Sequence, residues 1–202
     1  CDPLEDNSEV SIITIDSEEG LEIMRHTLTA QVLARAVKNL HPDTKLAIGP
    51  TIADGFYYDF EFKKAISPDD LASIEKEMKK IISNGSSITK TLHSKSDAIN
   101  IFKGLNESYK ESIISESEQD DNFQLYYQDN NEFVDLCRGP HLPSLKHIGA
   151  FRLTKLAGAY WKGDSKNKML TRIYGTAWKN EKELNAYLLR IEEAEKRDHR
   201  KL

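Results

Sequence analysis

The residues with the clearest chemical potential lie in one short stretch of the chain, Asp135–His141. It holds a thiol and an imidazole, Cys137 and His141, four positions apart. The Gly139-Pro140 pair between them predicts a turn that can direct both side chains into one cleft. Such a pair can bind a metal ion, use the thiol as a nucleophile, or position a water molecule and a substrate hydroxyl group. A redox dithiol is excluded because no second cysteine lies nearby.

The composition limits the classes of protein that can use this chemistry. The 202 residues are enough for one good-sized core, and 39% hydrophobic with 30% charged residues predicts a soluble globular chain. No apolar run is long enough to span a bilayer, and the first residues do not resemble a signal peptide. Two cysteines, Cys1 and Cys137, are too few for a disulfide framework and favour a reducing, cytoplasmic location. A net charge of -5 argues against bulk coating of nucleic acid but allows a local contact with one RNA end.

The first half of the chain predicts helices and strands in alternation. Residues 10–15 are β-branched and predict a strand, and a helix then opens with acids in its first turn and runs to about Leu40, stopped by Pro42. Residues 45–52 and 55–62 predict two strands around an Asp-Gly turn, the second with one buried face.

The remainder predicts further helices and a mainly antiparallel sheet. A proline and acids open a helix at residues 67–70, which ends near Asn84-Gly85. Further predicted elements are a strand at 88–92, a helix at 96–105 and a helix at 179–202. Residues 107–178 predict mostly strand and turn, with a hairpin around 129–131 and strands at 151–153, 158–161 and 170–174. The class is α+β: a mainly antiparallel sheet with a long N-terminal helix packed on it, a second small α/β part and a C-terminal linker helix.

Several sequence blocks, in this order, resemble one known family. Together they are similar to the editing domain of bacterial-type threonyl-tRNA synthetase, followed by the helix that leads into its aminoacylation core. The resemblance covers about residues 5–202. The blocks are Glu18–His26, Leu46–Pro50, Gly55–Asp59, Val134–His141, Lys155–Asp164, Ile173–Trp178 and Arg197–Lys201.

This resemblance implies a function, partners and a domain plan. Serine lacks only one methyl group of threonine, which is worth roughly 1–3 kcal/mol of discrimination, so a second site must hydrolyse serine from tRNA specific for threonine. The implied partners are that tRNA 3′ end carrying serine and the remainder of the synthetase, with no membrane; we expect the fragment to be monomeric and the parent enzyme to be a homodimer. We expect residues 1–17 to end an upstream domain or linker, 18–178 to form the editing domain and 179–202 to link it to the aminoacylation core. This chain alone would not aminoacylate tRNA.

The sequence departs from the family at the first helix. The family has two histidines at four-residue spacing, which lie on one face of a helix. Here His26 keeps the first position, but one residue is inserted and the second histidine is replaced by Gln31, five residues on. On a regular helix Thr27 and Gln31 would be the aligned pair. We expect instead a π-bulge across residues 26–31 that restores His26 to the cleft; a regular helix would displace His26.

The resemblance also implies roles for individual residues. The implied catalytic residues are His26, Lys110, Cys137 and His141, with His26 orienting or activating water and Lys110 helping to exclude threonine. The implied substrate-binding residues are Tyr58 at the pocket rim, Asp135 for the α-ammonium group, Gln31 and Thr27. We expect Tyr160-Trp161 to be core, and we expect no metal and no cofactor.

Two other functions stay open at the level of sequence. An editing-like domain weakened by the insertion and by Gln31 would only bind the acceptor end of the tRNA. Alternatively, His26, Cys137 and His141 could supply three zinc ligands, as in the zinc-dependent deacylases related to the alanyl enzyme. Gln31 would be a poor fourth ligand.

Overall fold

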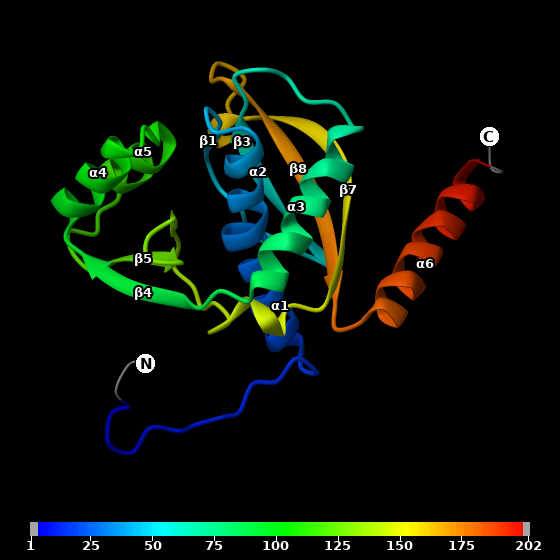
Figure 1. Ribbon diagram of the computed structural model, residues 1–202, viewed down its shortest axis with the longest axis horizontal. Coiled ribbons are helices and arrows are strands. Elements are labelled where there is room, and N and C mark those ends of the chain that lie inside the picture. The colour runs from blue at the N-terminus through cyan, green and yellow to red at the C-terminus, as the bar shows by residue number, and fades with distance from the viewer. Residues whose placement is uncertain (1–3, 200–202) are drawn as a thin grey trace.

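The main body of the protein is one antiparallel sheet covered on one face by helices (Figure 1). The computed structural model describes residues 4–199. The strands follow the order β1-β3-β8-β7, and β2 also pairs with β3. Their bounds are β1 Lys45–Leu46, β2 Thr51–Ile52, β3 Gly55–Glu61, β7 Ala150–Tyr160 and β8 Met169–Trp178. This sheet confirms the α+β class.

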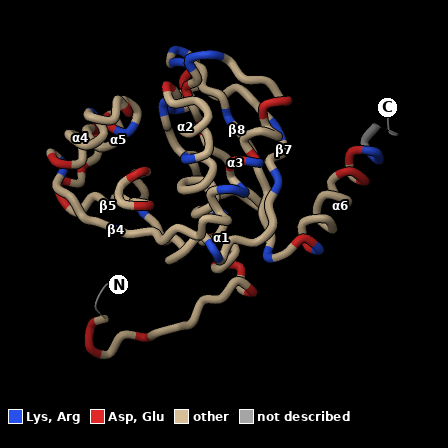
Figure 2. The backbone as a smooth tube through the Cα atoms, viewed as in Figure 1, with Lys and Arg blue, Asp and Glu red and all other residues tan. Residues whose placement is uncertain are grey.

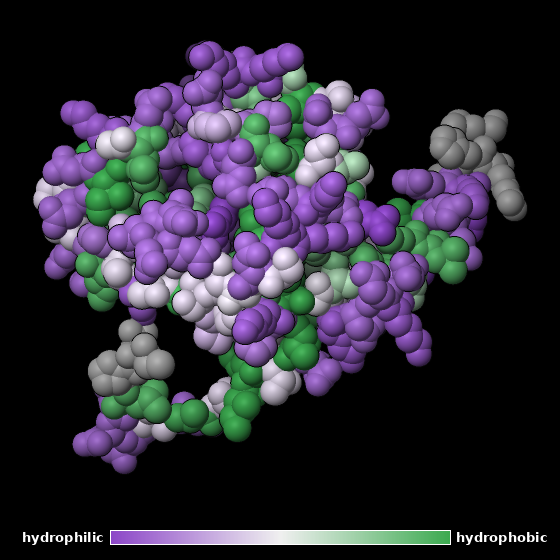
Figure 3. All heavy atoms as spheres, in the orientation of Figure 1, coloured by the Kyte–Doolittle hydropathy of each residue, from purple (hydrophilic) through white to green (hydrophobic). Residues whose placement is uncertain are grey.

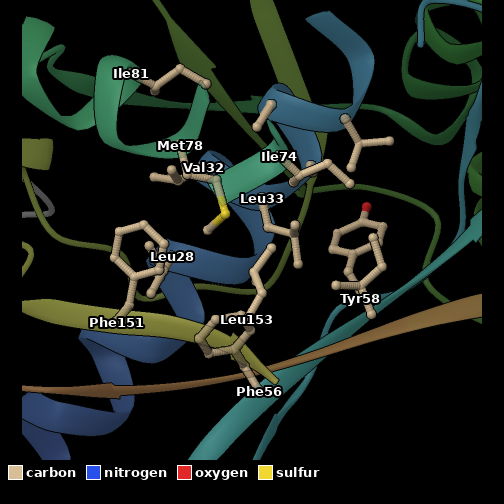
Figure 4. Packing of buried hydrophobic residues seen from close by; sticks show 14 of the residues in the cluster. Leu28, Val32, Leu33, Phe56, Tyr58, Ile74, Met78, Ile81, Phe151 and Leu153 are labelled. Atoms are coloured by element: carbon tan, nitrogen blue, oxygen red, sulfur yellow. The ribbon is translucent and has the colours of Figure 1, made fainter. Parts of the chain in front are cut away.

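One long helical segment and a second helix cover the inner face of this sheet. The long segment consists of α1 (Glu18–Thr27), a π-helix η1 (Leu28–Leu33) and α2 (Ala34–Leu40), and the second helix is α3 (Asp70–Asn84). Figure 4 shows Leu28 and Val32 of η1 against Met78 of α3 and Phe151 of β7. Leu28 is fully buried, so Leu28→Ala would cost about 2–5 kcal/mol of stability.

A smaller lobe lies beside this body and holds its own core. Its three-stranded sheet has the order β4-β5-β6 and carries two helices (Figure 1). The elements are β4 (Ile88–His93), α4 (Lys95–Gly104), α5 (Ser108–Glu116), β5 (Phe123–Gln128) and β6 (Phe133–Leu136). Phe102, Ile114 and Leu125 form the centre of its core. The predicted second small α/β part is thus present.

Two short 3₁₀ turns and a final helix complete the chain. They are η2 (Leu145–His147), η3 (Trp161–Gly163) and α6 (Glu181–His199), which projects from the body. Acidic and basic residues are interspersed along α6 and most other elements (Figure 2). Within residues 4–199, no helix combines the length and apolar character needed to cross a bilayer.

Four predicted elements were wrong in part. Residues 10–15 form no strand, because no strand of the described chain lies beside them to pair with, and Ile12 is 91% exposed. Figure 3 shows apolar side chains exposed along this N-terminal segment, which projects from the body. The predicted strand 45–52 is interrupted between β1 and β2. The strands expected at 151–153 and 158–161 are one strand, β7, with a bulge between Leu153 and Lys155. Residues 108–116 form α5 rather than strand and turn.

Two further expectations are corrected. Tyr160 is not a core residue, because it is 41% exposed at the end of β7. Trp161 is half-buried against the ring of Tyr109 instead of the core. The predicted end of the last helix, residues 200–202, and Cys1 lie outside the described residues.

Candidate active site

The turn after β6 carries the thiol and the imidazole back across the first helix. Gly139 has φ +63°, and a Cβ atom there would lie 2.1 Å from the hydroxyl oxygen of Tyr126. The position therefore requires glycine for both its backbone conformation and its close contact. Gly139 is followed by Pro140 through a cis peptide bond. The turn places Cys137 and His141 beside His26, but the two side chains line different cavities and not the single cleft that the Gly-Pro pair predicted.

These three side chains form one cluster. The Sγ atom of Cys137 lies 2.9 Å from Nε2 of His26, and the rings of His26 and His141 are 4.6 Å apart between centroids. One ligand atom from each of the three residues lies within 4.8 Å of the others. The cluster joins the N-terminal helix to the turn after β6, across more than a hundred residues of sequence.

Thr27 fixes the orientation and tautomer of His141. Its hydroxyl group donates to the carbonyl of Ile23 at 2.8 Å and accepts from the backbone N–H of Leu142 at 3.0 Å. Because its only proton is donated to Ile23, the Thr27 oxygen accepts from His141 Nδ1, 3.2 Å away. His141 then carries its proton on Nδ1, and Nε2 is a buried acceptor with no protein partner. Thr27, predicted to bind substrate, thus orients a neighbour.

Burial keeps the cluster uncharged at neutral pH. Burial raises the pKa of the Cys137 thiol to about 11, so the group is a thiol rather than a thiolate. Burial, and then the neighbouring His26, lowers the pKa of His141 to about 3. Burial also lowers the pKa of His26, which a hydrogen bond to the Pro140 carbonyl partly offsets. A thiolate nucleophile of the kind activated by an imidazolium is not formed here, whereas two neutral imidazoles can accept protons or hydrogen bonds.

A second polar group faces the cluster from the smaller lobe. Nζ of Lys110 lies 2.7 Å from Oδ1 of Asp135, and Tyr58 donates to Oδ2 at 2.9 Å. The backbone N–H of Leu136 also donates to Oδ1, at 2.8 Å. A carboxylate offers about four acceptor positions, so one position on Oδ2 stays open. Asp135 is 1% exposed, and its paired charge can accept one more donor in a water-poor setting.

One cavity connects the two groups. It has a volume of about 590 Å³, within the range of small-molecule sites. His26 and Cys137 line it from one group, and Lys110 and Asp135 line it from the other. His141 lines a neighbouring cavity on the far side of the cluster. The predicted residue Tyr58 lies behind this wall and supports Asp135 through a hydrogen bond, whereas Thr27 supports His141 on the far side of the cluster.

The first helix contains a π-helical turn, as predicted, but not at the predicted residues 26–31. The π-helix η1 spans Leu28–Leu33, two residues further along than expected, and the N–H of Ala34 donates five residues back to the carbonyl of Thr29. His26 therefore stays at the cavity. Ala30, four residues later, lines the same cavity, whereas Gln31 is fully buried and bonded to Gln128 at 2.9 Å through its side-chain oxygen. The structure does not bring Gln31 to the other site residues.

Several lining residues were missed at the level of sequence. Ile113 and Ser117 follow Lys110 at spacings that share one face of α5, and a helix prediction for 108–116 would have found them. Ile48, Gly49 and Pro50 form the opposite wall. They belong to the Leu46–Pro50 block, to which no role was assigned.

Comparison of the amino-acid sequence with known proteins identifies a matching family and several relatives. Residues 124–174 match the family described as the threonyl and alanyl tRNA synthetase second additional domain. The chain is 54% identical over 201 residues to the threonine–tRNA ligase of Francisella philomiragia. It is 51% identical over 199 residues to that of Wolbachia pipientis from Culex pipiens, and 50% identical over 199 residues to that of Hahella chejuensis. The alignments cover 98% to 100% of this chain.

Residues 124–174 of the chain belong to the second additional domain family of threonyl and alanyl tRNA synthetases. The chain spans 31% of the length of the threonine–tRNA ligases that it matches. The family match covers β6 and the turn after it, with Asp135, Cys137 and His141. His26 and Lys110 lie outside that range, and the fold brings them to it.

Proposed function

We propose that this chain hydrolyses the ester that links serine to the 3′ end of tRNA specific for threonine. The observation that supports this most is that one cavity joins a neutral imidazole–thiol cluster to a buried carboxylate–lysine pair. An aminoacyl ester needs both: a base and an oriented water at the carbonyl carbon, and an anion for the α-ammonium group.

The amino acid would bind at the Asp135 end of the cavity. The open acceptor position of Asp135 would receive one N–H of the α-ammonium group. Lys110 and Tyr58 hold this carboxylate in place and leave little space around it, since both are buried. A methyl group added at the serine β-carbon would then meet this wall, which is how threonine would be rejected.

The ester would lie at the His26 end. His26 is the better proton acceptor, because burial lowers its pKa without the additional effect of a second histidine that accompanies the shift of His141 to about 3. We assign to His26 the role of general base toward water. His141 would support the ring of His26 from the far side of the cluster. The Cys137 thiol, whose Sγ lies 2.9 Å from Nε2 of His26, would turn to donate to the developing oxyanion as His26 accepts the proton of water.

The domain plan and partners follow as part of this proposal. Residues 18–178 would form the editing unit, α6 would lead to the aminoacylation core, and residues 4–17 would belong to the connection with upstream sequence. In this plan the chain works in the cytoplasm, and as an isolated monomer it binds tRNA weakly, because its net charge of -5 adds no general attraction for the phosphate backbone.

A deacylation assay tests the function directly. Threonine-specific tRNA would be charged with radiolabelled serine or threonine, and release would be followed with wild-type protein and with Lys110→Met and His26→Ala. We expect serine release well above background from the wild type, little from His26→Ala, and little release of threonine. If wild-type protein releases serine no faster than buffer while still retaining the tRNA end, the domain only binds the acceptor end.

A second candidate is a zinc-dependent deacylase, favoured by the compact His26, Cys137 and His141 donor set. Two imidazoles and a sulfur within 4.8 Å suit zinc, and Nε2 of His141, which has no hydrogen-bond partner, has a lone pair free for a metal ion. A bound zinc ion would lower the pKa of water in the cavity. Metal analysis of the purified chain, with deacylation measured before and after chelation, separates the two: we expect activity that a chelator does not change.

A further inference from the structure

The helix that carries Lys110 is held against the body by a buried carboxylate that the proposed chemistry does not use. Glu107 precedes α5 and is 3% exposed. Its Oε2 accepts from the backbone N–H of Leu46 at 2.7 Å, and its Oε1 lies 2.9 Å from Nζ of Lys38. Leu46 is in β1, an edge strand of the main sheet. Its backbone N–H has no neighbouring strand to bond, and the Glu107 carboxylate accepts this hydrogen bond instead.

Lys38 is held in this contact by three partners of its ammonium group. Its ammonium group donates to the carbonyls of Pro42 and Thr44, at 3.1 and 2.8 Å, as well as to Glu107. All three of its donor positions are therefore used. The Glu107 carboxylate is buried and the Lys38 side chain partly buried, and burial raises the pKa of Glu107 against the opposing effect of Lys38. The contact is thus a fixed point between the lobe and the body.

From this fixed point α5 presents one face to the cavity. Lys110, Ile113 and the C-cap residue Ser117 line the cavity. They are three and then four residues apart, a spacing that places them on one face of the helix. A second contact lies just before them: the Tyr109 hydroxyl donates to Glu61 at the end of β3, and its ring meets Trp161 edge-on at 4.9 Å. Lys110 directly follows these two attachments, at Glu107 and Tyr109.

We propose that Glu107 is a positioning residue that sets where Lys110 and the α5 wall stand, and thereby sets the discrimination between serine and threonine. This inference rests on the proposed function. A cavity excludes one extra methyl group only if the residues that line it are held rigidly. The contacts that hold these lining residues therefore matter as much as the residues themselves. Loss of Glu107 would let α5 move away from β1, and the cavity would admit the larger side chain.

The test compares Glu107→Ala with Glu116→Ala, an acid at the exposed end of the same helix. Hydrolysis of seryl and threonyl tRNA would be measured with each. In Glu107→Ala we expect the ratio of serine to threonine release to fall by about tenfold, mainly through faster threonine hydrolysis, because a local opening of α5 changes the shape of the site rather than its base. In Glu116→Ala the ratio should not change. An unchanged ratio in Glu107→Ala overturns the proposal.

A second measurement does not depend on catalysis. Lys110 is 3% exposed and should react slowly with an amine-acylating reagent. Peptide mass spectrometry should show faster labelling of Lys110 in Glu107→Ala, but not in Glu116→Ala. Lys38 and Lys162, which lose their partners in Glu107→Ala and Glu116→Ala respectively, are left out of the comparison, and the other lysines should not change. This readout decides the proposal even if the wild type shows no deacylation, which would defeat only the proposed function. If Glu107→Ala does not fold, Glu107→Gln, which keeps the acceptor for Leu46, decides by the same two measurements.

Discussion

Replacing Thr27 with valine tests the orientation of His141. Valine keeps the shape of the side chain but removes the oxygen that accepts from Leu142 and His141. The backbone N–H of Leu142 and the Nδ1–H of His141 would each lose a partner in a partly buried setting. One unsatisfied buried donor costs about 1–3 kcal/mol, and partial burial places each in the lower half of that range. With two such donors, we therefore expect Thr27→Val to lose about 2–4 kcal/mol of unfolding free energy.

The same substitution should change the tautomer of His141. Without an acceptor at Nδ1, the proton can move to Nε2, and the unpartnered acceptor at the cluster is lost. Urea unfolding gives the stability, ¹⁵N NMR of the imidazole gives the tautomer, and release of serine from charged tRNA gives the activity. Thr27→Ser is the control: it keeps the oxygen, and the loss of one buried methyl should cost about 1 kcal/mol. If Thr27→Val matches Thr27→Ser in stability and leaves the Nδ1–H tautomer in place, the hydrogen-bond assignment is wrong.

Four further outcomes are expected. Because the pKa of His141 is about 3 in the fold against 6.5 in the free side chain, the unfolded chain binds more protons between these values, so stability should fall as pH falls from 6.5 toward 3. This one group should contribute about 1.4 kcal/mol per pH unit, a slope that urea unfolding of His141→Gln should lack; equal slopes would refute the shift. Lys110→Met should cost about 3–5 kcal/mol because it leaves Asp135 buried without its cation, and Lys110→Met with Asp135→Asn should recover part of this in the same assay. Gly139→Ala should cost about 1–3 kcal/mol or more, from its positive φ and the contact with Tyr126, with a loss of serine release; full stability would contradict the turn geometry. Ala30→His should place an imidazole in the cavity and alter serine release, whereas Gln31→His should only destabilise the chain, as thermal melting can show.

Local patterns were sufficient for much of the fold. The cap at Ser17, the turn before β3 and the glycine after α3 each determine their backbone through one residue type, so these boundaries could be predicted. The segment 10–15 shows the limit of such patterns, because β-branched residues form a strand only where a partner strand exists. Helix α5 was missed for a related reason. Its buried face includes Lys110, whose burial depends on Asp135 in a strand far along the chain.

The candidate site divides in the same way. Cys137 and His141 could be found from spacing, because a short turn holds them. The roles of Thr27 and Gln31 could not, because a one-residue difference in helix phase decides which side chain reaches the cavity. Glu107 gives no local signal at all, since its partners Lys38 and Leu46 belong to two other elements.

The π-helix η1 has a consequence for how this chain tolerates changes in length. In a regular helix, an added residue would turn every later side chain by about 100° and take α2 out of the core. Here the wide turn takes up the added residue within Leu28–Leu33, and Ala34, Ala36 and Val37 stay buried. The two ends of the segment can therefore vary independently: the first half carries His26 to the cavity, and the second half packs against α3. Neither half fixes the number of residues in the π-helical turn between them. A change of one residue in this turn can therefore alter the lining of the cavity without unfolding the protein.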